Sequence, residues 1–440
     1  MTSLLSFLRA RPVLVFLAAA ILLPNLLYLG AMAIGIGTPP RPIAILLYPV
    51  IALFAPRIPR VATVAAYLTL AIYDLFTTVG LMFNFVATEL LGSVRFSSQL
   101  NPLESSLYVA LAAVFLSATI GALWLLTRER DALRRAPLAV PLAMALCLSG
   151  GDLWLNRLPH YNFGSAVAQG HPFESAARES GFEAAALSGP PRNVLLVIVE
   201  GLGVFQDPGQ QRLVTAPLAR VGDTGRYAVT MGTTTYFGST TAAELREMCA
   251  TRASYTHFLD KPAPDCLPHR LAARGMDSIG LHGFSGDMFE RTRWWPHMGL
   301  RRALFGDAMT ELPQCGGVFH GACDPAMAAT VADLLRAAPG PLLVYWLTLN
   351  THVPVEDGEH SGAIPCRADG PFGDSEVCDM AGMWHDLFEK IAGLAADPSL
   401  PPMEILVVGD HAPPLLDRDL RTMFQPGRVT WIRLAPRPAS

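Results

Sequence analysis

The sequence predicts an α-helical membrane domain of five passes followed by an α/β domain with a mostly parallel sheet. The first observation is that 51% of the 440 residues are hydrophobic and that long apolar segments crowd the N-terminal third. The second is that apolar, strand-length runs alternate with helical patterns after residue 193, as in parallel sheets. The third is that two of those runs end in carboxylates, Glu200 and Asp410. We therefore expect a transmembrane domain over 1–155, a linker over 156–192 and an extracytoplasmic domain over 193–440.

Five apolar segments could each form a membrane helix. Most reach the roughly 20 residues that such a helix needs, although the second segment is short. A cleaved signal peptide would account for only one of them. Buried helices of a soluble domain would not be so long and so poor in charge. The segments cover residues 11–36, 41–56, 61–85, 106–127 and 136–155.

Arginines in the connecting loops predict the orientation in the membrane. They flank the apolar segments in three groups, and a five-pass topology places all three groups on the same side. The positive-inside rule makes that side cytoplasmic, so the chain after about residue 156 is expected on the opposite face. The groups are Arg9 and Arg11; Arg57 and Arg60; and Arg128, Arg130, Arg134 and Arg135.

Cysteine usage agrees with an exported domain. Cys147 lies alone in the last apolar segment, and six cysteines follow in the exported part. An even number in an oxidising compartment suggests disulfides. A metal–thiolate site is less favoured because no C-x-x-C pair occurs. Among fifteen possible pairings we favour the local ones, Cys249–Cys266, Cys315–Cys323 and Cys366–Cys378.

The exported part reads as alternating strands and helices, after a linker with one short helix near 174–180. We expect a mostly parallel sheet with helices on both faces. The expected strands are 193–200, 226–231, 277–281, 341–349, 404–408 and 429–434, and the expected helices are 241–248, 267–273, 325–337 and 377–395.

Three metal-ligand residues follow two of the expected strands. Glu200 ends the run that starts at Asn193, and Asp410 and His411 follow the run that starts at Glu404. In open α/β sheets, ligands gather at the carboxyl ends of the strands, so we expect these side chains to meet. Two oxygen donors and one imidazole suit one divalent metal, Zn²⁺ or Mn²⁺.

Thr240 lies in a Gly-Ser-Thr-Thr sequence directly before an expected helix. Free backbone N–H groups at a helix N-terminus favour an anion. On the local sequence alone, an ordinary N-cap is the favoured interpretation. The functional interpretation is that Thr240 is a metal-bound nucleophile that attacks phosphorus.

Three further residues are candidates for binding a phosphate. His282 and His352 each follow an apolar strand, where an imidazole can serve as acid, base or ligand. Arg291, in Phe289-Glu290-Arg291, suits bidentate phosphate contact, although a surface ion pair is about equally expected for a lone arginine. Histidines without such placement are interpreted as ordinary, and these include His160, His269, His297 and His385.

Two features of the membrane domain stay open. Asp74 lies inside the third apolar segment, and an acid there is a functional candidate by default. An interhelical hydrogen bond is about as good an interpretation. The loop 86–105, with Glu89, Arg95 and Asn101, is expected to be a solvated connector. The alternative is an interfacial piece that faces lipid headgroups.

Several motifs follow one another along the chain: strand–Glu200, Gly-Ser-Thr–helix, His282-Gly, Phe-x-Arg, Asn-Thr-His-x-Pro and Gly-Asp-His. This ordered set resembles the sulfatase-like branch of the alkaline phosphatase superfamily. More closely, it resembles membrane-anchored headgroup transferases: lipoteichoic acid synthases, phosphoglycerol transferases and phosphoethanolamine transferases. The resemblance implies five membrane helices followed by a sulfatase-like catalytic domain. It also implies a bacterial inner (cytoplasmic) membrane location with that domain on the periplasmic side.

The resemblance also implies roles for single residues. The metal ligands of that family match Glu200, Thr240, Asp410 and His411, and Thr240 is also the nucleophile. The residues that bind the substrate phosphate and assist proton transfer match His282, Arg291 and His352. Phe289 occupies a substrate-binding position where the synthases have tryptophan.

The implied reaction has two steps. Thr240 attacks the phosphodiester of a membrane phospholipid and expels diacylglycerol, and the phospho-threonine then passes its headgroup phosphate to an envelope glycan or lipid acceptor, or to water. No nucleic-acid partner is expected. The alternatives are a hydrolase of the same fold and a catalytically inactive membrane scaffold. A true sulfatase is disfavoured because Cys249-Ala-Thr-Arg252 does not fit the C/S-x-P-x-R sequence.

Two departures leave the donor undecided. Gly201 follows the metal glutamate where the family often has serine, and no additional histidine shortly follows His411. The missing histidine favours a phosphoglycerol donor. The paired cysteines around the nucleophile helix resemble the phosphoethanolamine branch instead.

Overall fold

The computed structural model describes residues 11–83, 85, 87–156 and 172–437, with the side chains of 87–89 left aside. Arg9, His160 and the side chain of Glu89 therefore lie outside the described residues. The chain divides into two compact units, which we call the helical unit and the sheet unit. The helical unit is Met1–Leu90, Ser105–Phe163 and Leu416–Asp419, and the sheet unit is Leu91–Glu104, Gly164–Leu415 and Leu420–Ser440.

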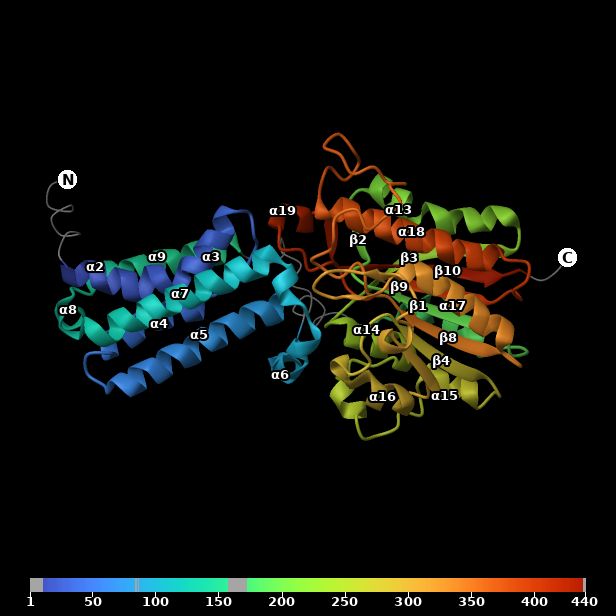
Figure 1. Ribbon diagram of the computed structural model, residues 1–440, viewed down its shortest axis with the longest axis horizontal. Coiled ribbons are helices and arrows are strands. Elements are labelled where there is room, and N and C mark those ends of the chain that lie inside the picture. Colours follow the sequence, from blue (N-terminus) through green and yellow to red (C-terminus); the bar gives the residue numbers. More distant parts are fainter. Residues whose placement is uncertain (1–10, 84, 86, 157–171, 438–440) are drawn as a thin grey trace. The chain divides into compact units, whose positions relative to one another are not determined.

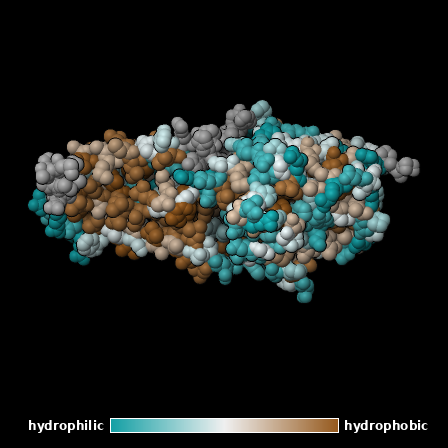
Figure 2. All heavy atoms as spheres, turned by 90° about the horizontal axis from the view of Figure 1, so that it is seen from above, coloured by the Kyte–Doolittle hydropathy of each residue, from teal (hydrophilic) through white to brown (hydrophobic). Residues whose placement is uncertain are grey.

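The helical unit is built from apolar helices whose outward side chains are hydrophobic, as the brown surface in Figure 2 shows. Three helices are long and apolar enough to cross a membrane: Arg11–Ala33, Arg60–Met82 and Ser106–Arg128. Two further apolar helices, Pro42–Phe54 and Ala139–Leu155, are shorter. The expected five passes are thus matched by five apolar helices but not confirmed as five spans, because the second and fifth fall short of the length that a bilayer requires.

The helices of this unit follow the expected apolar segments closely. The first consists of α2, a π-helical turn and α3, and the unit also contains the short basic helix α8. The bounds are α2 Arg11–Leu17, η1 Ala18–Leu22, α3 Leu23–Ala33, α4 Pro42–Phe54, α5 Arg60–Met82, α7 Ser106–Arg128, α8 Arg130–Arg135 and α9 Ala139–Leu155, with α6 Ala87–Ser93 at the boundary between the units.

Asp74 takes part in a buried ionic cluster inside the helical unit. Its carboxylate accepts hydrogen bonds from Arg41 Nε at 2.8 Å and Nη2 at 2.5 Å, and from Tyr48 Oη at 3.1 Å. The backbone N–H of Arg41 donates to Asp152 at 2.6 Å. Since charges in an apolar interior are stable only when they are paired, these contacts favour the interhelical interpretation of Asp74.

The sheet unit contains one eight-stranded sheet of order β2-β10-β9-β1-β8-β4-β5, with β3 paired to β10. Strands β9, β1, β8, β4 and β5 are parallel neighbours, whereas β10 is antiparallel to β9, β2 and β3. The sheet is therefore mixed, and the expected mostly parallel sheet is not confirmed. The strands are β1 Val194–Val199, β2 Gly203–Phe205, β3 Tyr227–Thr235, β4 Asp277–His282, β5 Arg302–Phe305, β8 Leu342–Leu347, β9 Glu404–Gly409 and β10 Phe424–Pro436.

The antiparallel direction of β10 follows from the connection between β9 and β10. A parallel return needs a long crossover, usually a helix. The connection from β9 to β10 holds only the four-residue helix α19, Arg418–Arg421, so β10 runs back beside β9.

Helices cover both faces of this sheet, as Figure 1 shows, with α13, α17 and α18 on one face and α14, α15 and α16 on the other. All six residues of β1 are fully buried, as expected for a strand covered on both faces. Side chains alternate along a strand, and Leu196 and Ile198 belong to the core cluster that contains Trp294 and Trp295 of α16. The helices are α13 Pro208–Arg220, α14 Thr240–Cys249, α15 Leu267–Ala272, α16 Arg291–His297, α17 Asp324–Ala337 and α18 Glu376–Ala396; the linker contributes α11 Ala176–Glu179 and α12 Phe182–Ala186.

The three favoured disulfides, Cys249–Cys266, Cys315–Cys323 and Cys366–Cys378, are present in the sheet unit. Cys315 and Cys323 lie on either side of a two-stranded hairpin, β6 Gln314–Cys315 and β7 Gly321–Ala322. Cys147, in the helical unit, is an exposed free thiol.

The end of β9 requires glycine. A Cβ atom on Gly409 would lie 2.0 Å from the carbonyl oxygen of Leu202, so Gly409→Ala should reduce the free energy of unfolding by about 1–3 kcal/mol through overpacking. Gly393, exposed in α18 with no atom within 4 Å of its Cβ position, is the control, and Gly393→Ala should stabilise by about 0.5–1 kcal/mol. Thermal unfolding of the full chain, followed by tryptophan fluorescence, measures both. Equal stability of the two variants would contradict this packing.

Candidate active site with a metal centre

Four neighbouring parallel strands deliver the predicted site residues to one edge of the sheet. In the order β9-β1-β8-β4, the carboxyl ends of the strands lead into Asp410 and His411, into Glu200, into the loop that holds His352, and into His282. Parallel strands place their carboxyl ends at the same edge. Residues that lie two hundred positions apart in the sequence are therefore brought together by the strand order.

The three expected metal ligands converge. Ligand atoms of Glu200, Asp410 and His411 all lie within 4.8 Å of one another, and all three side chains are buried. His411 Nε2 lies 3.3 Å from Asp410 Oδ2 and 3.6 Å from Glu200 Oε1. The hydroxyl of Thr240 lies 3.3 Å from Glu200 Oε2 and 3.5 Å from His411 Nε2.

The chemistry of this group fits a divalent cation. Within the described part of the chain, Glu200 Oε1 and Asp410 Oδ2 are buried and have no hydrogen-bond partner. His411 Nδ1 lies 3.0 Å from the carbonyl of Ala412, so Nδ1 is the protonated nitrogen and the lone pair of Nε2 faces the two carboxylates. Two carboxylates and one imidazole lone pair thus face one another, an arrangement that a shared divalent cation would satisfy. The separations also match the edge of a tetrahedron of zinc ligands, about 3.3–3.4 Å for bonds of about 2.0–2.1 Å.

Burial and the Asp410 carboxylate raise the pKa of Glu200 well above its ordinary value. The cause is the cost of holding two negative charges close together in a medium with little water. A bound cation would remove that cost.

The backbone around Glu200 is fixed by hydrogen bonds from the loop that follows β8 and from α18. Its N–H donates to Thr348 Oγ1 at 2.9 Å, and its carbonyl accepts from Thr351 Oγ1 at 2.7 Å and from Trp384 Nε1 at 3.1 Å. Gly201 follows in the left-handed region with φ of 66°, and its N–H donates to Asp410 Oδ1 at 2.8 Å. A Cβ atom there would lie 3.2 Å from Met380, so the backbone at this position favours glycine.

Thr240 is the first residue of α14, and its side chain is partly exposed. Gly238 turns the chain with φ of 69°, and the N-cap residue is Ser239, whose side chain makes no capping hydrogen bond. Thr240 is therefore not the N-cap that the local sequence favoured. Its hydroxyl points instead toward the metal-ligand group, and the helix N-terminus adds positive potential there.

An arginine of α14 holds the loop of Asp410 and His411. Arg246 is fully buried and donates to the carbonyls of Gly409 at 2.8 Å and Asp410 at 3.1 Å. Its charge is balanced by Glu247 at 2.6 Å. Glu247 also accepts from Ser175 Oγ and from the N–H of Ala177, which ties the linker helix to the site.

Arg291 is buried and paired. Glu244 Oε1 accepts from Arg291 Nε at 3.0 Å and Nη2 at 2.9 Å, and the carbonyl of Met288 accepts from Nη1 at 3.2 Å. The guanidinium has five N–H donors, so these described contacts occupy three of them and leave two for a phosphate. The surface ion pair that we weighed for Arg291 is wrong, because the pair is buried.

The two residues before Arg291 have an unusual backbone. Phe289 and Glu290 both have φ of 55°, in the left-handed region that L-residues avoid. Such a conformation costs about 1–3 kcal/mol per residue. It aims the guanidinium of Arg291 along the face of the Phe289 ring, 5.5 Å from the ring centroid.

Both candidate histidines present a neutral imidazole. His282 Nδ1 lies 3.1 Å from the carbonyl of Leu347, and His352 Nδ1 lies 2.8 Å from the carbonyl of Val353. Each ring therefore keeps its proton on Nδ1 and a lone pair on Nε2. Burial lowers the pKa of both histidines, to about 4 for His352. The charge of Arg291 lowers the pKa of His282 further. The ring of Phe319 lies on His352 with 3.7 Å between centroids.

A buried aspartate that sequence reasoning missed positions the loop of His352. Asp324 Oδ2 accepts from the N–H groups of Leu349 at 2.9 Å and Asn350 at 2.7 Å. The side chain of Asn350 accepts in return from the N–H of Asp324 at 2.5 Å. Burial raises the pKa of Asp324 to about 7.

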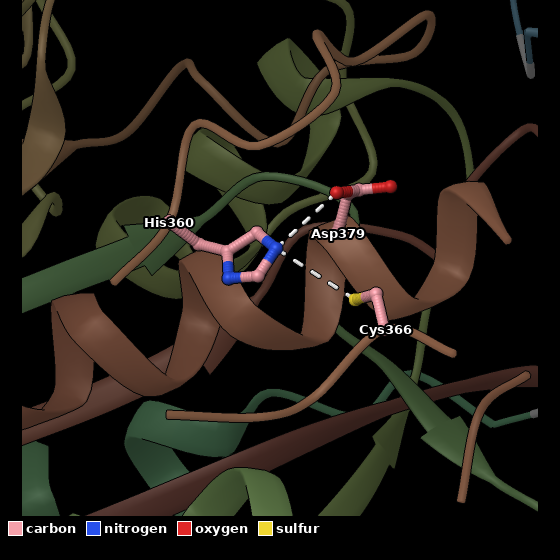
Figure 3. Close-up of side chains that lie close together, drawn as sticks. All are labelled: His360, Cys366 and Asp379. Carbon is pink, nitrogen blue, oxygen red and sulfur yellow. Dashed lines mark hydrogen bonds and ion pairs between the residues drawn. The ribbon is translucent and has the colours of Figure 1, made fainter. Parts of the chain in front are cut away.

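His360, Cys366 and Asp379 form a second group of possible metal ligands (Figure 3). His360 Nε2 is 3.3 Å from Asp379 Oδ1 and 3.7 Å from Cys366 Sγ. Cys366 is bonded to Cys378, and a disulfide sulfur carries no thiolate charge for a metal. We interpret this group as a polar contact around a disulfide.

Comparisons with known proteins give matches among solved structures only. No family model matches the sequence, and no curated protein matches it. The lipoteichoic acid synthase from Listeria monocytogenes is 14% identical over 57% of this chain and 66% of that chain, just under two thirds of its length, with a TM-score of 0.44. The phosphoglycerol transferase from Streptococcus pyogenes is 14% identical over 58% of this chain and 73% of that chain, with a TM-score of 0.41.

A third similar structure covers both units. It is the integral membrane lipooligosaccharide phosphoethanolamine transferase A from Neisseria meningitidis, which is 12% identical over 97% of this chain and 88% of that chain, with a TM-score of 0.43. The chain is thus similar to members of the group that its motifs resemble. At these identities and TM-scores, a likeness does not by itself establish an activity.

The raised pKa of Asp324 predicts that the free energy of unfolding depends on pH. Its value of about 7 in the folded chain exceeds the ordinary 3.8, so between these values the folded state binds more protons than the unfolded state. The free energy of unfolding must then fall as the pH rises through this window, by at most about 4 kcal/mol. We expect thermal unfolding between about pH 5 and about pH 8 to show this fall in the wild type and a smaller fall in Asp324→Asn, because the raised pKa of Glu200 contributes in the same direction in both proteins.

The control for this experiment lies on the same helix. Asp333 of α17 is exposed, and Asp333→Asn should keep the wild-type dependence on pH. If Asp324→Asn loses stability with pH in parallel with the wild type, Asp324 does not titrate in this window.

Proposed function

We propose that the protein is a metal-dependent transferase that moves a phospho-headgroup from a membrane phospholipid to an envelope glycan or lipid through a phospho-threonine at Thr240. The observation that carries this proposal is the Thr240 hydroxyl at the N-terminus of α14, 3.3 Å from Glu200 and 3.5 Å from His411. The apolar helices support a membrane location. The proposed site residues are Glu244, as the partner of Arg291, and those expected from the motifs: Glu200, Thr240, His282, Phe289, Arg291, His352, Asp410 and His411.

Glu200, Asp410, His411 and Thr240 would hold one divalent cation, Zn²⁺ or Mn²⁺. When bound, such a cation supplies positive charge that lowers the pKa of a ligated hydroxyl and stabilises charge on phosphoryl oxygens. The buried carboxylate oxygens without partners, and the Nε2 lone pair of His411, support this assignment.

In the first step, the Thr240 oxygen forms a bond to phosphorus, and the bond between phosphorus and the diacylglycerol oxygen breaks. The Thr240 proton ends on that departing oxygen. Two donors of Arg291 can hold the phosphoryl oxygens, and the ring of Phe289 lies beside them. His352 and His282, neutral at pH 7, can accept and return a proton at Nε2.

In the second step, an acceptor hydroxyl forms the new bond to phosphorus and the bond to Thr240 breaks. The proton of the acceptor returns to the Thr240 oxygen, and a neutral imidazole can assist. Both headgroups, phosphoglycerol and phosphoethanolamine, fit this scheme. The proposed setting is a bacterial inner membrane crossed five times, with the sheet unit on the periplasmic side.

Thr240→Ala tests the nucleophile. In full-length protein reconstituted with headgroup-labelled phospholipid and candidate glycan or lipid acceptors, this change should reduce transfer by about 10⁴-fold or more. Mass spectrometry of the wild-type peptide that contains Thr240 should show the mass of the trapped headgroup phosphate. Label that appears in water alone, and in no acceptor, would identify a phosphodiesterase.

Thr241→Ala is the matched control, since this hydroxyl follows Thr240 directly but contacts Ser239 at 3.3 Å. It should retain activity within about tenfold. Unchanged turnover in Thr240→Ala would rule out the phospho-threonine route.

A further inference from the structure

The connection between α5 and α7 contains a segment that belongs to the sheet unit. The segment Leu91–Glu104 belongs to that unit, although it connects two helices of the helical unit. It contains two 3₁₀ turns, η2 Val94–Gln99 and η3 Pro102–Glu104. We expected a solvated connector here, and most of the segment is exposed or half-buried, but Phe96 within it is buried.

The contacts of this segment concentrate on the stretch that precedes Arg291. The guanidinium of Arg95 pairs with the carboxylate of Glu290. The ring of Phe96 lies 5.9 Å from the ring of Phe289 and is only 6% exposed. The segment thus places a charge against one residue of the left-handed pair and an aromatic ring against the other.

Other contacts extend this packing toward the catalytic loops. Phe96 clusters with Phe284, which follows His282 by two positions, and with Leu349, which precedes the loop of His352. The N–H of Asn101 donates to the carbonyl of Val318 at 3.0 Å. Val318 is followed by Phe319, whose ring lies on His352. A single short segment therefore packs against chain neighbours of His282 and Arg291, and against the stretch before Phe319, whose ring lies on His352.

The left-handed pair needs such support. Phe289 and Glu290 are consecutive residues in a conformation that L-residues avoid, and such strain persists only where the surroundings fix it. Within the sheet unit, Trp294 Nε1 donates to the carbonyl of Phe289 at 2.9 Å and Arg293 pairs with Glu290 at 2.6 Å. Both of those contacts come from α16 itself. The Arg95 and Phe96 contacts come from outside the helix, as does the ring of Tyr255, whose centroid lies 6.0 Å from that of Phe289.

We propose that Arg95 and Phe96 are positioning residues for phosphate binding: they hold the left-handed Phe289–Glu290 pair, which sets the direction of the Arg291 guanidinium. This inference rests on the proposed function in that it takes Arg291 to be the phosphate-binding arginine. It assigns to the connection between two membrane helices a role in binding the donor phosphate.

The experiment measures the affinity of the purified, full-length, metal-loaded protein for inorganic phosphate, and KM and kcat for the soluble phosphodiester bis(4-nitrophenyl) phosphate. A small displacement of a substrate-holding group can cost up to about 100-fold. We expect Phe96→Ala to weaken phosphate binding and raise KM about tenfold, and Arg95→Ala about threefold, with smaller changes in kcat. Phe96→Tyr and Arg95→Lys should restore most of the affinity.

A double-mutant cycle identifies the residue through which the segment acts. In an Arg291→Ala background, Phe96→Ala and Arg95→Ala should change phosphate affinity less than twofold, because coupled residues are not additive. Arg220→Ala, which removes the exposed Arg220–Glu389 pair of the same unit, is the control and should alter neither affinity nor KM.

Two results would overturn the inference. One is full additivity, in which Phe96→Ala weakens phosphate binding as much with Arg291→Ala as without it. The other is a fall in unfolding temperature with unchanged phosphate affinity, which would make the segment a structural tie only. Failure of the proposed function has a different signature: the wild type would bind phosphate through Arg291 and yet transfer no headgroup.

Discussion

Two buried carboxylates that face one imidazole lone pair are the constraint on which this site depends. Glu200, Asp410 and His411 place their ligand atoms within 4.8 Å of one another in a buried position. Two unit charges at such a separation repel by about 3–4 kcal/mol at an effective dielectric constant of about 20. Without a positive charge among them the arrangement would be disfavoured, and a divalent cation is the species that satisfies all three donors at once.

The surrounding structure serves to keep those donors in place. Thr348 and Thr351, in the loop that follows the neighbouring strand, bind the backbone of Glu200, and Arg246 binds the carbonyls that precede His411. Arg246 lies on the helix that begins with Thr240. The proposed nucleophile and the metal loop are therefore fixed by one element, which explains how residues 171 positions apart keep a separation of 3.5 Å.

The sequence allowed the central strands and the ligand trio to be predicted, because apolar runs that end in Glu200 and Asp410 are a local pattern with a direct structural meaning. It did not reveal Glu244 and Arg246. On a helical pattern, charges in TAAELREM indicate a solvated face, whereas both side chains are buried: Glu244 pairs with Arg291, and Arg246 donates to the carbonyls of Gly409 and Asp410. The left-handed backbone at Phe289 and the packing of Phe96 likewise have no local signal, since they depend on contacts nearly two hundred positions apart. The antiparallel β10 was missed for a similar reason, because strand direction is set by the connection rather than by the strand's own composition.

The most direct test of this account is the metal content of the purified full-length protein, measured by elemental mass spectrometry after dialysis. The account predicts about one equivalent of zinc or manganese per chain, and its loss in Glu200→Gln and in Asp410→Asn, because each change removes a ligand charge. Asp379→Asn, in the cluster around the Cys366–Cys378 disulfide, should keep the full equivalent. A folded wild type that binds no divalent metal, or metal retained by both ligand variants, would contradict it.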